Sequence, residues 1–510
     1  MEIIWSTVLT VWGWLLDHLL YINLAFSIII IFFQRRDPRS VWTWLLALYF
    51  IPVFGIVFYL LFGQDMKKSR MFRVKEVSDR LNLPVKSQED IIRSDDMPEE
   101  MMDPMSRDFK SLIIYNLETS GSVLTVNNQV QIYTDGQAKF EALRNALRQA
   151  RRFIHIQYYI IKNDELFDSI VPILLDKVRE GVEVRILCDG MGGRFMPKKR
   201  WDQMRRAGIK VGVFFPPFLG WLNLRVNYRN HRKIVVVDGA TGFVGGFNIG
   251  REYISRDPKF GYWRDTHLEI KGEAAISLQI RFALDWNYVT GENLFKEIRY
   301  FGEEAEYARR WLNGQIHAVW PDPEHVSEMV CMQIITSGPD TREPHIRNNY
   351  LELFHKAKHH IYIQTPYFIP DDAIFSSLKI AALSGVDVRL MIPCKPDHPF
   401  VYWATCSYAG ELLDYGARVY VYENGFLHSK GIMVDGRVSC YGTANMDIRS
   451  FELNFEVNAT IYDEDVTGQL EEAFMNDLPH CREITREEYG DRNLWMRIKE
   501  QSSRLLSPLL

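Results

Sequence analysis

The sequence predicts an α/β protein of two similar halves, each a mostly parallel sheet flanked by helices, behind an N-terminal transmembrane helical hairpin. Two observations predict the halves: one pattern occurs at both 230–239 and 427–436, and the segments around it repeat as well. A third observation, two long apolar runs before residue 63, predicts the hairpin. Only two repeats are present, about 200 residues apart, so we expect two halves packed about a pseudo-two-fold axis and not a solenoid.

The repeated pattern is His, any residue, Lys, four residues, Asp and Gly. Its three charged or titratable side chains fall at His231, Lys233 and Asp238 in the first copy and at His428, Lys430 and Asp435 in the second. The apolar run after each lysine predicts a buried strand closed by an Asp-Gly turn. Side chains alternate along a strand, so His and Lys share one face and Asp lies on the other. Two copies face to face would surround one pocket with two imidazoles and two ammonium groups, which suits a phosphodiester.

The repeat extends to neighbouring segments. The matching pairs are 153–157 with 361–364 and 181–187 with 385–390. Between the members of each pair lies a stretch long enough for a helix, which predicts strand-helix-strand units. Downstream, Asn248 and Asn445 each stand 17 residues after the motif histidine. The two halves therefore share one register.

With these residues in view, the chain resembles the phospholipase D superfamily and, within it, the bacterial cardiolipin synthases. The resemblance rests on both motifs and on the segments 336–340, 364–370, 425–430 and 454–456. It covers nearly the whole chain, including the N-terminal segment. It implies two phospholipase D-like halves and a phosphatidyltransferase that joins two phosphatidylglycerol molecules. The products would be cardiolipin and glycerol, formed through a phosphohistidine intermediate.

Two histidines suit this reaction because it needs two roles. An imidazole titrates near pH ~6.5, so one histidine can be a neutral nucleophile while the other is a protonated acid. The resemblance implies that His231 attacks phosphorus and that His428 protonates the departing alcohol, then deprotonates the incoming one. The residues alone leave this order open. The groups expected to hold the non-bridging oxygens are Lys233, Lys430, Asn248 and Asn445.

An imidazole that attacks through one nitrogen needs an acceptor on the other nitrogen. Asp238 and Asp435 lie on the wrong face, so we expect them to serve turn formation and packing between the halves. Asp265 and Glu456 lie 34 and 28 residues after their histidines, on the following strand. In the superfamily a carboxylate at about this place binds the catalytic histidine, which implies that role here. The alternative is an ordinary strand carboxylate in a salt bridge.

No cofactor is expected. The remaining histidines show no metal-ligand spacing, the six cysteines form no Cys-x-x-Cys pair, and no Gly-rich phosphate loop is present. Exchange of one phosphodiester for another is roughly energy-neutral and needs no nucleotide. The net charge of -5 argues against nucleic acid as a partner, because nucleic-acid binding normally needs a basic face.

The N-terminus predicts a multi-pass protein of the cell membrane. Val41 to Phe62 is an uncharged run of 22 residues, long enough to cross a hydrocarbon core of ~30 Å, and Pro52 is expected to kink it. A first span is expected from about Trp14 to Phe33. Basic residues divide 5 to 3 in favour of the side that follows the second span. This division and the unpaired cysteines predict a cytoplasmic catalytic region, with phosphatidylglycerol, other anionic phospholipids and the bilayer as partners.

We therefore expect five regions: two transmembrane helices at 1–63, a polar linker at 64–120, the first half at 121–300, a connector at 301–345, and the second half with a C-terminal tail at 346–510. Two surface features leave alternatives open. The basic cluster at 194–206 fits anionic lipid headgroups or a solvated helix face. The aromatic segment at 213–222 fits a loop in the membrane interface or packing between the halves.

Two other functions remain as alternatives. A hydrolytic phospholipase D or phosphodiesterase would share both motifs, with water intercepting the phosphohistidine. A non-catalytic membrane scaffold of the same fold is disfavoured by the intact His and Lys pairs. The products formed from phosphatidylglycerol would distinguish all three.

Overall fold

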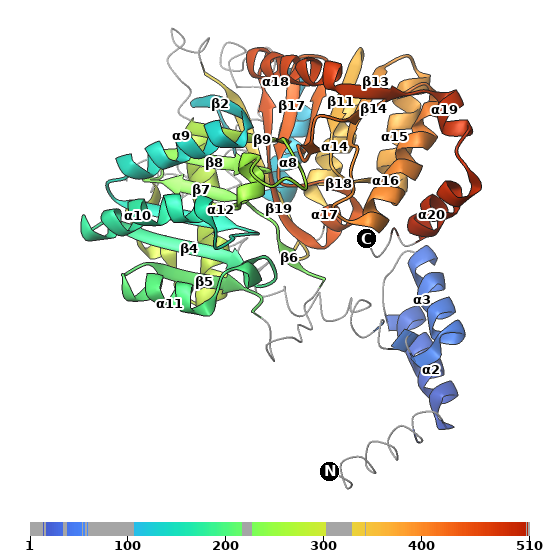
Figure 1. The fold of residues 1–510 in the computed structure, drawn as a ribbon, viewed down its shortest axis with the longest axis horizontal. Coiled ribbons are helices and arrows are strands. Elements are labelled where there is room, and N and C mark those ends of the chain that lie inside the picture. Colours follow the sequence, from blue (N-terminus) through green and yellow to red (C-terminus); the bar gives the residue numbers. More distant parts are fainter. Residues whose placement is uncertain are drawn as a thin grey trace.

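Two α/β halves lie side by side, with a short helical hairpin projecting from one end (Figure 1). The fold is that of a computed structural model, which describes residues 14, 17–33, 38–53, 55, 56, 59, 107–216, 227–301, 329–341, 343–505 and 507. Several helices begin where the sequence places an aspartate, whose carboxylate accepts hydrogen bonds from the first free backbone N–H groups. These N-caps are Asp135, Asp164, Asp371 and Asp463.

The first half is built on an eight-stranded sheet of order β15-β9-β8-β7-β3-β4-β5, with β2 also paired to β9. Its strands are β2 (Asn128–Asp135), β3 (Phe153–Tyr158), β4 (Glu183–Asp189), β5 (Lys210–Phe214), β7 (Ile234–Val237), β8 (Thr241–Gly245), β9 (Trp263–Gly272) and, from the second half, β15 (Phe426–Leu427). Its helices are α9 (Gly136–Gln149), α10 (Glu165–Arg179), α11 (Lys198–Arg206) and α12 (Glu273–Thr290).

The second half is built on a ten-stranded sheet whose central order, β19-β17-β16-β11-β13-β14, matches β9-β8-β7-β3-β4-β5 of the first. Its strands are β1 (Leu124–Thr125), β10 (Cys331–Ser337), β11 (His360–Gln364), β13 (Asp387–Pro393), β14 (Arg418–Tyr422), β16 (Gly431–Val434), β17 (Val438–Gly442), β19 (Asn454–Tyr462), β20 (Cys481–Ile484) and, from the first half, β6 (Arg229–Asn230). A separate pair is β12 (Phe368–Ile369) with β18 (Met446–Asp447). Its helices are α8 (Lys110–Ser120), α14 (His345–Lys356), α15 (Asp372–Leu383), α16 (Pro399–Leu412), α17 (Ile448–Glu452), α18 (Glu464–Asp477), α19 (Arg486–Gly490) and α20 (Leu494–Leu505). The matching strand order agrees with the predicted duplication.

Both sheets are mixed, so the expectation of mostly parallel sheets is wrong. In the first half β3, β4 and β5 are parallel neighbours, whereas β7, β8 and β9 pair antiparallel. The cause is the Asp-Gly turn itself. Asp238 and Gly239 adopt positive φ angles of 56° and 72°, and this short turn connects neighbouring antiparallel strands, since a parallel connection needs a dozen residues or more. Asp435 and Gly436 form the same turn in the second half.

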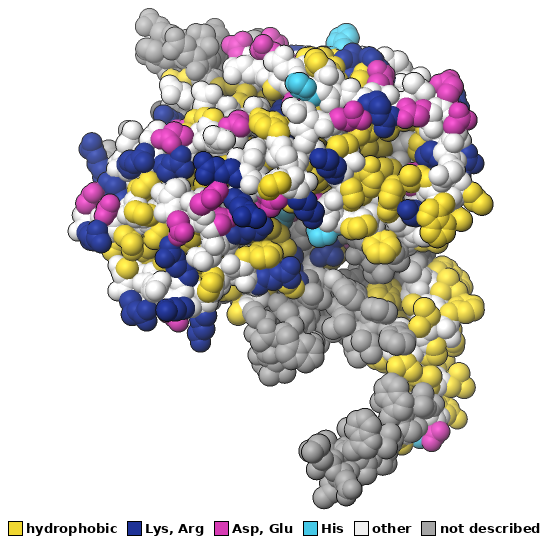
Figure 2. Space-filling model, viewed as in Figure 1, with side chains coloured by type: hydrophobic (Ala, Val, Ile, Leu, Met, Phe, Trp, Pro, Cys, Tyr) yellow, Lys and Arg dark blue, Asp and Glu magenta, His cyan; other side chains and the backbone are white. Residues whose placement is uncertain are grey.

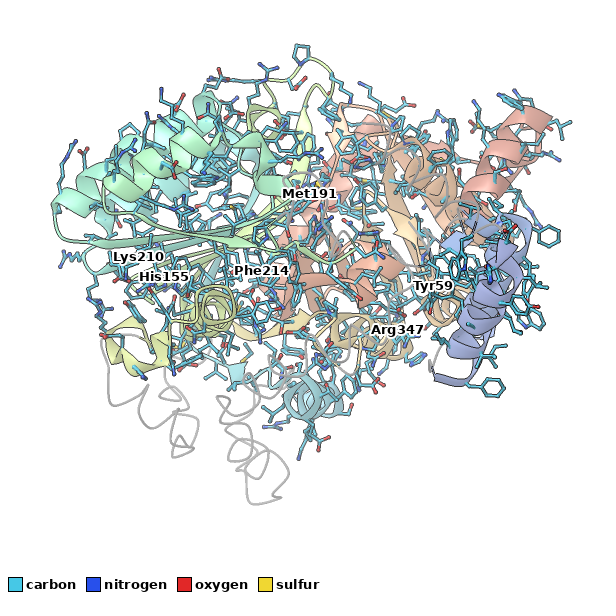
Figure 3. The ribbon with its side chains drawn as sticks, turned by 90° about the horizontal axis from the view of Figure 1, so that it is seen from below. Tyr59, His155, Met191, Lys210, Phe214 and Arg347 are labelled. Carbon is cyan, nitrogen blue, oxygen red and sulfur yellow. The ribbon has the colours of Figure 1, made fainter. Side chains whose placement is uncertain are left out.

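One hydrophobic cluster joins the halves. It contains α12 from the first half, α18 from the second, and inward-facing residues of both sheets. Phe214 and Phe215, from the aromatic segment whose role was left open, are buried there, with ring centroids 5.1 and 6.1 Å from Phe455. Phe214 accordingly lies nearer the second half in Figure 3, whereas His155 and Lys210 lie farther out. For this part of the segment, packing between the halves is confirmed; residues 217–226 lie outside the described residues.

The predicted domain boundaries need correction. Residues 110–120, assigned to a polar linker, form α8, which buries Leu112, Ile113 and Leu117 in the core of the second half. The second-half strand β10 lies inside the predicted connector, and β1 pairs with it. The charged residues at 94–100 favour a linker, and the prediction wrongly extended this linker over the apolar residues that form α8. Residues 60–106 and 302–328 lie outside the described residues.

The N-terminal hairpin lies on the side of α20 (Figure 1). α2 (Leu19–Ile28) continues into a π-helical segment, Ile29–Phe33, and α3 (Pro38–Phe50) follows. The chain bends at Ile51, directly before Pro52, where a kink was predicted. In the part of the chain that the structure describes, no helix is both long and apolar enough to cross a membrane. The spans predicted at 14–33 and 41–62 lie partly outside that part.

Candidate active site

The site begins with an exchange of short strands between the halves. β6, directly before the first motif, pairs with the start of β19 in the second half. β15, directly before the second motif, pairs in the same way with the start of β9 in the first half. The next backbone bonds continue both pairings: His231 N donates to Phe455 O at 2.9 Å, and His428 N donates to Arg264 O at 2.7 Å. Glu456 follows Phe455 in the chain, and Asp265 follows Arg264. The pairing therefore places His231 beside Glu456 and His428 beside Asp265.

This pairing gives each imidazole a carboxylate from the opposite half. Nδ1 of His231 lies 2.9 and 3.1 Å from the two carboxylate oxygens of Glu456. Nδ1 of His428 lies 2.6 Å from Oδ2 of Asp265. A carboxylate accepts a hydrogen bond from Nδ1–H, which keeps the proton on Nδ1 and leaves Nε2 with its lone pair in both rings. Asp265 and Glu456 thus lie where a carboxylate that orients an imidazole must lie, and the crossing between halves is the feature that the sequence did not reveal.

The two carboxylates are themselves buried and held. Thr443 Oγ1 donates to Glu456 at 2.5 Å, and Asn454 Nδ2 donates to it at 3.4 Å. Asp265 accepts from Thr266 N at 2.8 Å. Both carboxylates are fully buried, with exposed fractions of 0 %. Such support restricts each imidazole to one orientation.

The lysines lie between these groups. Lys233 Nζ donates to the His231 carbonyl at 2.6 Å, whereas Lys430 Nζ lies 2.9 Å from Nδ1 of His428 and also donates to the His428 carbonyl. Burial lowers the pKa of Lys233 to about 7 and that of Lys430 to about 8, and Glu456 and Asp265 oppose this effect on both. Burial and then Lys430 lower the pKa of His428 to about 4. Burial also lowers the pKa of His231, and both Lys233 and Lys430 contribute to that shift, so the two motifs act on each other electrostatically.

The two predicted amides are buried near these groups but are engaged elsewhere. Asn248 accepts from Ile160 N at 3.1 Å and donates to the Tyr253 hydroxyl at 3.1 Å. Asn445 donates to Asp447 at 3.1 Å. Their expected contact with non-bridging oxygens therefore has no support from these hydrogen bonds. The amides hold neighbouring loops in place.

Asp238 and Asp435 lie away from the imidazoles. Asp238 accepts from three successive backbone N–H groups, 151 to 153, at 2.8, 2.8 and 2.9 Å. Asp435 accepts from residues 358 to 360 at 2.7, 2.8 and 2.8 Å. The predicted turn role is confirmed. The predicted role of these two aspartates in packing between the halves is wrong, because each aspartate holds the start of a strand in its own half.

Two buried ion pairs close to the motifs were not predicted from the sequence. Arg232, inside the first motif, donates from Nη1 to both carboxylate oxygens of Asp285 at 2.8 and 2.6 Å, and Gln157 donates to the same aspartate at 2.8 Å. The second pair joins Arg264 to Asp477 at 2.8 Å, with Gln364 as donor at 2.8 Å. Gln157 and Gln364 occupy matching positions in the repeat. A polar residue at the same place in two apolar strands was the sequence feature that could have indicated these buried ion pairs.

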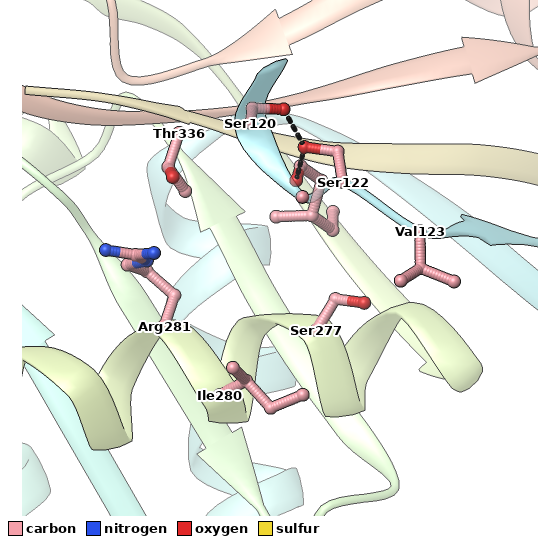
Figure 4. Close-up of a pocket in the computed structure, with 9 residues that line it drawn as sticks. Ser120, Ser122, Val123, Ser277, Ile280, Arg281 and Thr336 are labelled. Carbon is pink, nitrogen blue, oxygen red and sulfur yellow. Dashed lines mark hydrogen bonds between the residues drawn. The ribbon is translucent and has the colours of Figure 1, made fainter. Parts of the chain in front are cut away.

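Two cavities lie away from the motif histidines, and the larger, of about 400 Å³, is lined by residues of α19 and α20 such as Arg486, Tyr489 and Arg497. Among the described residues, no cluster of His, Cys, Asp or Glu could hold a metal ion. The smaller cavity, between α8, α12 and β10, has a volume of about 30 Å³, enough for about one water molecule. Its lining is drawn in Figure 4 and includes Ser122, Ser277 and Thr336. It contains neither motif histidine and is too small for a lipid headgroup.

The chain is similar to known proteins over most of its length. A family model described as "Cardiolipin synthase, PLD-like domain" matches residues 143–266 and 350–478. The major cardiolipin synthase ClsA of Bacillus subtilis (strain 168) is 45% identical over 506 residues, which cover 97% of this chain and 99% of the relative. The chain belongs to the bacterial cardiolipin synthases of the phospholipase D superfamily.

Further matches agree with membership in the cardiolipin synthases. The cardiolipin synthase 2 of Staphylococcus epidermidis (strain ATCC 35984 / DSM 28319 / BCRC 17069 / CCUG 31568 / BM 3577 / RP62A) is 47% identical over 491 residues, 96% of each chain. A model described as "Phospholipase_D-nuclease N-terminal" matches residues 22–64. The phosphatidylserine synthase structure from Haemophilus influenzae Rd KW20 has a TM-score of 0.58 at 17% identity and covers 80% of this chain and 97% of its own, which supports the fold. The resemblance inferred from the motifs is confirmed.

Proposed function

We propose that the protein transfers the phosphatidyl group of one phosphatidylglycerol to a second, giving cardiolipin and releasing glycerol. One observation carries this proposal: each His-x-Lys pair acts electrostatically on the histidine of the other, and each imidazole is held at Nδ1 by a carboxylate of the opposite half. This leaves Nε2 of both rings for a reacting phosphodiester. Membership in the cardiolipin synthases supports phosphatidylglycerol as the substrate.

The reaction takes two steps. In the first, Nε2 of His231 attacks phosphorus, the bond from phosphorus to the glycerol oxygen breaks, and His428 gives that oxygen a proton. The products are a phosphatidyl-histidine and free glycerol. In the second, His428 takes the proton from a hydroxyl of the second phosphatidylglycerol, whose oxygen attacks phosphorus and releases His231. Lys233 and Lys430 stabilise the charge on the non-bridging oxygens in both transition states.

His428 needs a proton for the first step. Its pKa of about 4 reflects burial and the neighbouring Lys430. An anionic phosphodiester bound beside Lys430 raises the pKa of His428, because a negative charge stabilises the imidazolium. His231 must be neutral to attack, and the lowered pKa of His231 favours that form.

A phosphodiester with a p-nitrophenol leaving group tests the two assignments, because p-nitrophenolate departs without a general acid. His428→Ala should still release a burst of p-nitrophenol and accumulate phosphohistidine. His231→Ala should release none. The opposite pattern would exchange the two roles.

The products formed from phosphatidylglycerol test the activity itself. Purified full-length protein in micelles should yield cardiolipin and glycerol in equal amounts. Phosphatidic acid with glycerol would indicate a hydrolytic phospholipase D, and no product would indicate a scaffold. Removal of divalent ions with a chelator should leave the rate unchanged.

We also propose that the N-terminal hairpin anchors the protein in the membrane with two spans. Large apolar side chains are exposed along it, including Leu20, Phe32, Trp42 and Phe50. Asn23, in contrast, is buried between the helices, where it donates to Leu48 O at 2.8 Å. Apolar residues outside and a polar group inside are typical of helices in lipid.

A second apolar surface, on the same side of the molecule as the hairpin, also supports contact with the membrane. α20 exposes Leu494, Trp495 and Ile498, and Phe400 of α16 is exposed as well. Figure 2 shows hydrophobic side chains gathered over this side, from which α2 and α3 project. We propose that this side faces the bilayer from the cytoplasm, and that anionic phospholipids, not nucleic acid, are its partners. Protease access to the catalytic region in sealed vesicles of known orientation tests the topology.

A further inference from the structure

Two arginines from different halves lie near Tyr159, whose ring lies close to that of His231. Arg229 belongs to β6, two residues before the histidine, and is 7 % exposed. Arg449 belongs to α17, and its Nη2 donates to Asn227 O at 3.0 Å, which ties α17 to the chain leading into β6. Tyr159 completes the group, with its ring centroid 5.0 Å from that of His231.

Positive charge is concentrated at this point. Burial lowers the pKa of Arg449, and Arg229 lowers it further, because two guanidinium ions lie close together. Burial and then Asp189 raise the pKa of Tyr159, whereas Arg229 and Arg449 lower it, so two arginines and one aspartate act on this hydroxyl. Among the described residues Arg449 forms no salt bridge, and its nearest acidic influence is Asp447. The Asp447 carboxylate is engaged with Ser450 N at 2.6 Å and Asn445 Nδ2 at 3.1 Å.

The equivalent place beside His428 lacks this charge. Counted from the motif residues, Phe426 stands where the first half has Arg229, and Pro366 stands where it has Tyr159. The position equivalent to Arg449 is Glu252, which pairs with Lys162 at 2.5 Å. In the proposed reaction, one lysine from each half already stabilises the charge on the phosphate under attack. The one-sided arginine pair is therefore additional to the machinery that the two halves share.

We propose that Arg229, Arg449 and Tyr159 form a second anion subsite, which binds the phosphate of the acceptor phospholipid. The inference rests on the proposed function: joining two phosphatidylglycerol molecules brings two phosphodiesters together, and only one of them is attacked. The other stays intact, one glycerol unit away. Guanidinium groups suit this phosphate, because they bind it through paired, charge-assisted hydrogen bonds and stay protonated in doing so.

Acceptor choice provides the test. Full-length protein in phosphatidylglycerol micelles with added ethanol forms two products, cardiolipin from the anionic acceptor and phosphatidylethanol from the neutral one. Arg449→Gln should lower cardiolipin formation about 10-fold or more at limiting phosphatidylglycerol and leave phosphatidylethanol formation within about twofold. Arg449→Lys should restore part of the cardiolipin. Arg256→Gln, which removes an exposed arginine paired with Glu165 at 3.3 Å, is the matched control and should change neither product.

Inorganic phosphate separates a lipid headgroup from free phosphate. In the wild-type protein it should suppress cardiolipin more than phosphatidylethanol, and Arg449→Gln should lose this selective inhibition. If phosphate inhibits selectively but Arg449→Gln forms cardiolipin normally, the site binds free phosphate and the acceptor proposal is wrong. Equal loss of both products in Arg449→Gln, with an unchanged melting temperature, also contradicts it. A wild-type protein that forms phosphatidic acid in place of cardiolipin would contradict the proposed function and, with it, any acceptor subsite.

Discussion

Each half orients the histidine of the other half, and the two carboxylates that do so differ in length. In the second half, Glu456 on β19 reaches His231 and is held by the Thr443 hydroxyl at 2.5 Å. In the first half, the shorter Asp265 on β9 reaches His428, and Gly246 occupies the position equivalent to Thr443.

Space explains the difference. A Cβ atom at Gly246 would lie 1.9 Å from Oδ1 of Asp265, so the short carboxylate requires a glycine beside it. The longer Glu456 leaves room for a threonine, whose hydroxyl then anchors it. Two local solutions therefore produce one geometry at Nδ1. The exchanged strands fix where each imidazole lies, and the neighbouring residue is adapted to the carboxylate present.

Removing the carboxylate charge is the strongest way to break this comparison. Glu456→Gln and Asp265→Asn should each lower kcat by about 10²- to 10⁴-fold, because a neutral amide no longer selects the Nδ1–H tautomer or stabilises an imidazolium. Asp238→Asn should leave kcat nearly unchanged. Steady-state cardiolipin formation measures all three variants. A larger loss in Asp238→Asn than in the other two would undo the assignment.

The glycine beside Asp265 offers a subtler change. Gly246→Ala should lower kcat by about 10²-fold, because the added methyl group displaces Asp265 by an ångström or more from His428. Gly468→Ala is the matched control, since a Cβ there meets nothing within 4 Å, and it should keep full activity with a slightly higher melting temperature. Normal turnover in Gly246→Ala would mean that Asp265 does not position His428.

The lysines predict a pH dependence shared by both halves. With a pKa of about 7 for Lys233 and about 8 for Lys430, the phosphate-binding charge is present below these values and lost above them. kcat/KM should therefore fall several-fold as pH rises from 7 to 9. The decline of kcat should occur at a higher pH than the decline of kcat/KM, because bound phosphate raises the pKa of both lysines. Lys430→Arg, whose charge persists, should flatten the alkaline decline; a kcat/KM that stays constant to pH 9 in the wild type would contradict the prediction.

The smallest effects concern stability, where the halves should respond alike. Asp238→Ala and Asp435→Ala each remove three hydrogen bonds to backbone N–H groups. Each should lower the free energy of unfolding by about 1–3 kcal/mol. Thermal denaturation of the two variants measures this, and strongly unequal shifts would show that the matching turns are not equivalent.

The sequence predicted the components of the site better than their connections. His231 and His428 were recognisable because each stands in a repeated strand and turn context, and Asp265 and Glu456 because they follow at matched places. Their crossing was not predictable, because β6 and β15 have only two residues each and show no periodicity. Their pairing is long-range, and nothing within either segment encodes its partner.

The remaining errors have local causes. The sheets were expected to be mostly parallel because strand-helix-strand units dominate the repeat, although the Asp-Gly turns already implied antiparallel neighbours. α8 was missed because it follows an acidic stretch. Arg229 and Arg449 lie more than 200 residues apart in sequence, so their proximity emerges only when the halves are packed.

The exchanged strands make the catalytic unit indivisible. Either half expressed alone would display an imidazole with no carboxylate at Nδ1, and mixing the two separately folded halves should restore turnover only as they associate. A single-half protein built on the same plan would obtain an oriented histidine only by pairing with another copy of itself. In this chain, covalent linkage makes such an encounter intramolecular, so the assembled centre does not depend on protein concentration.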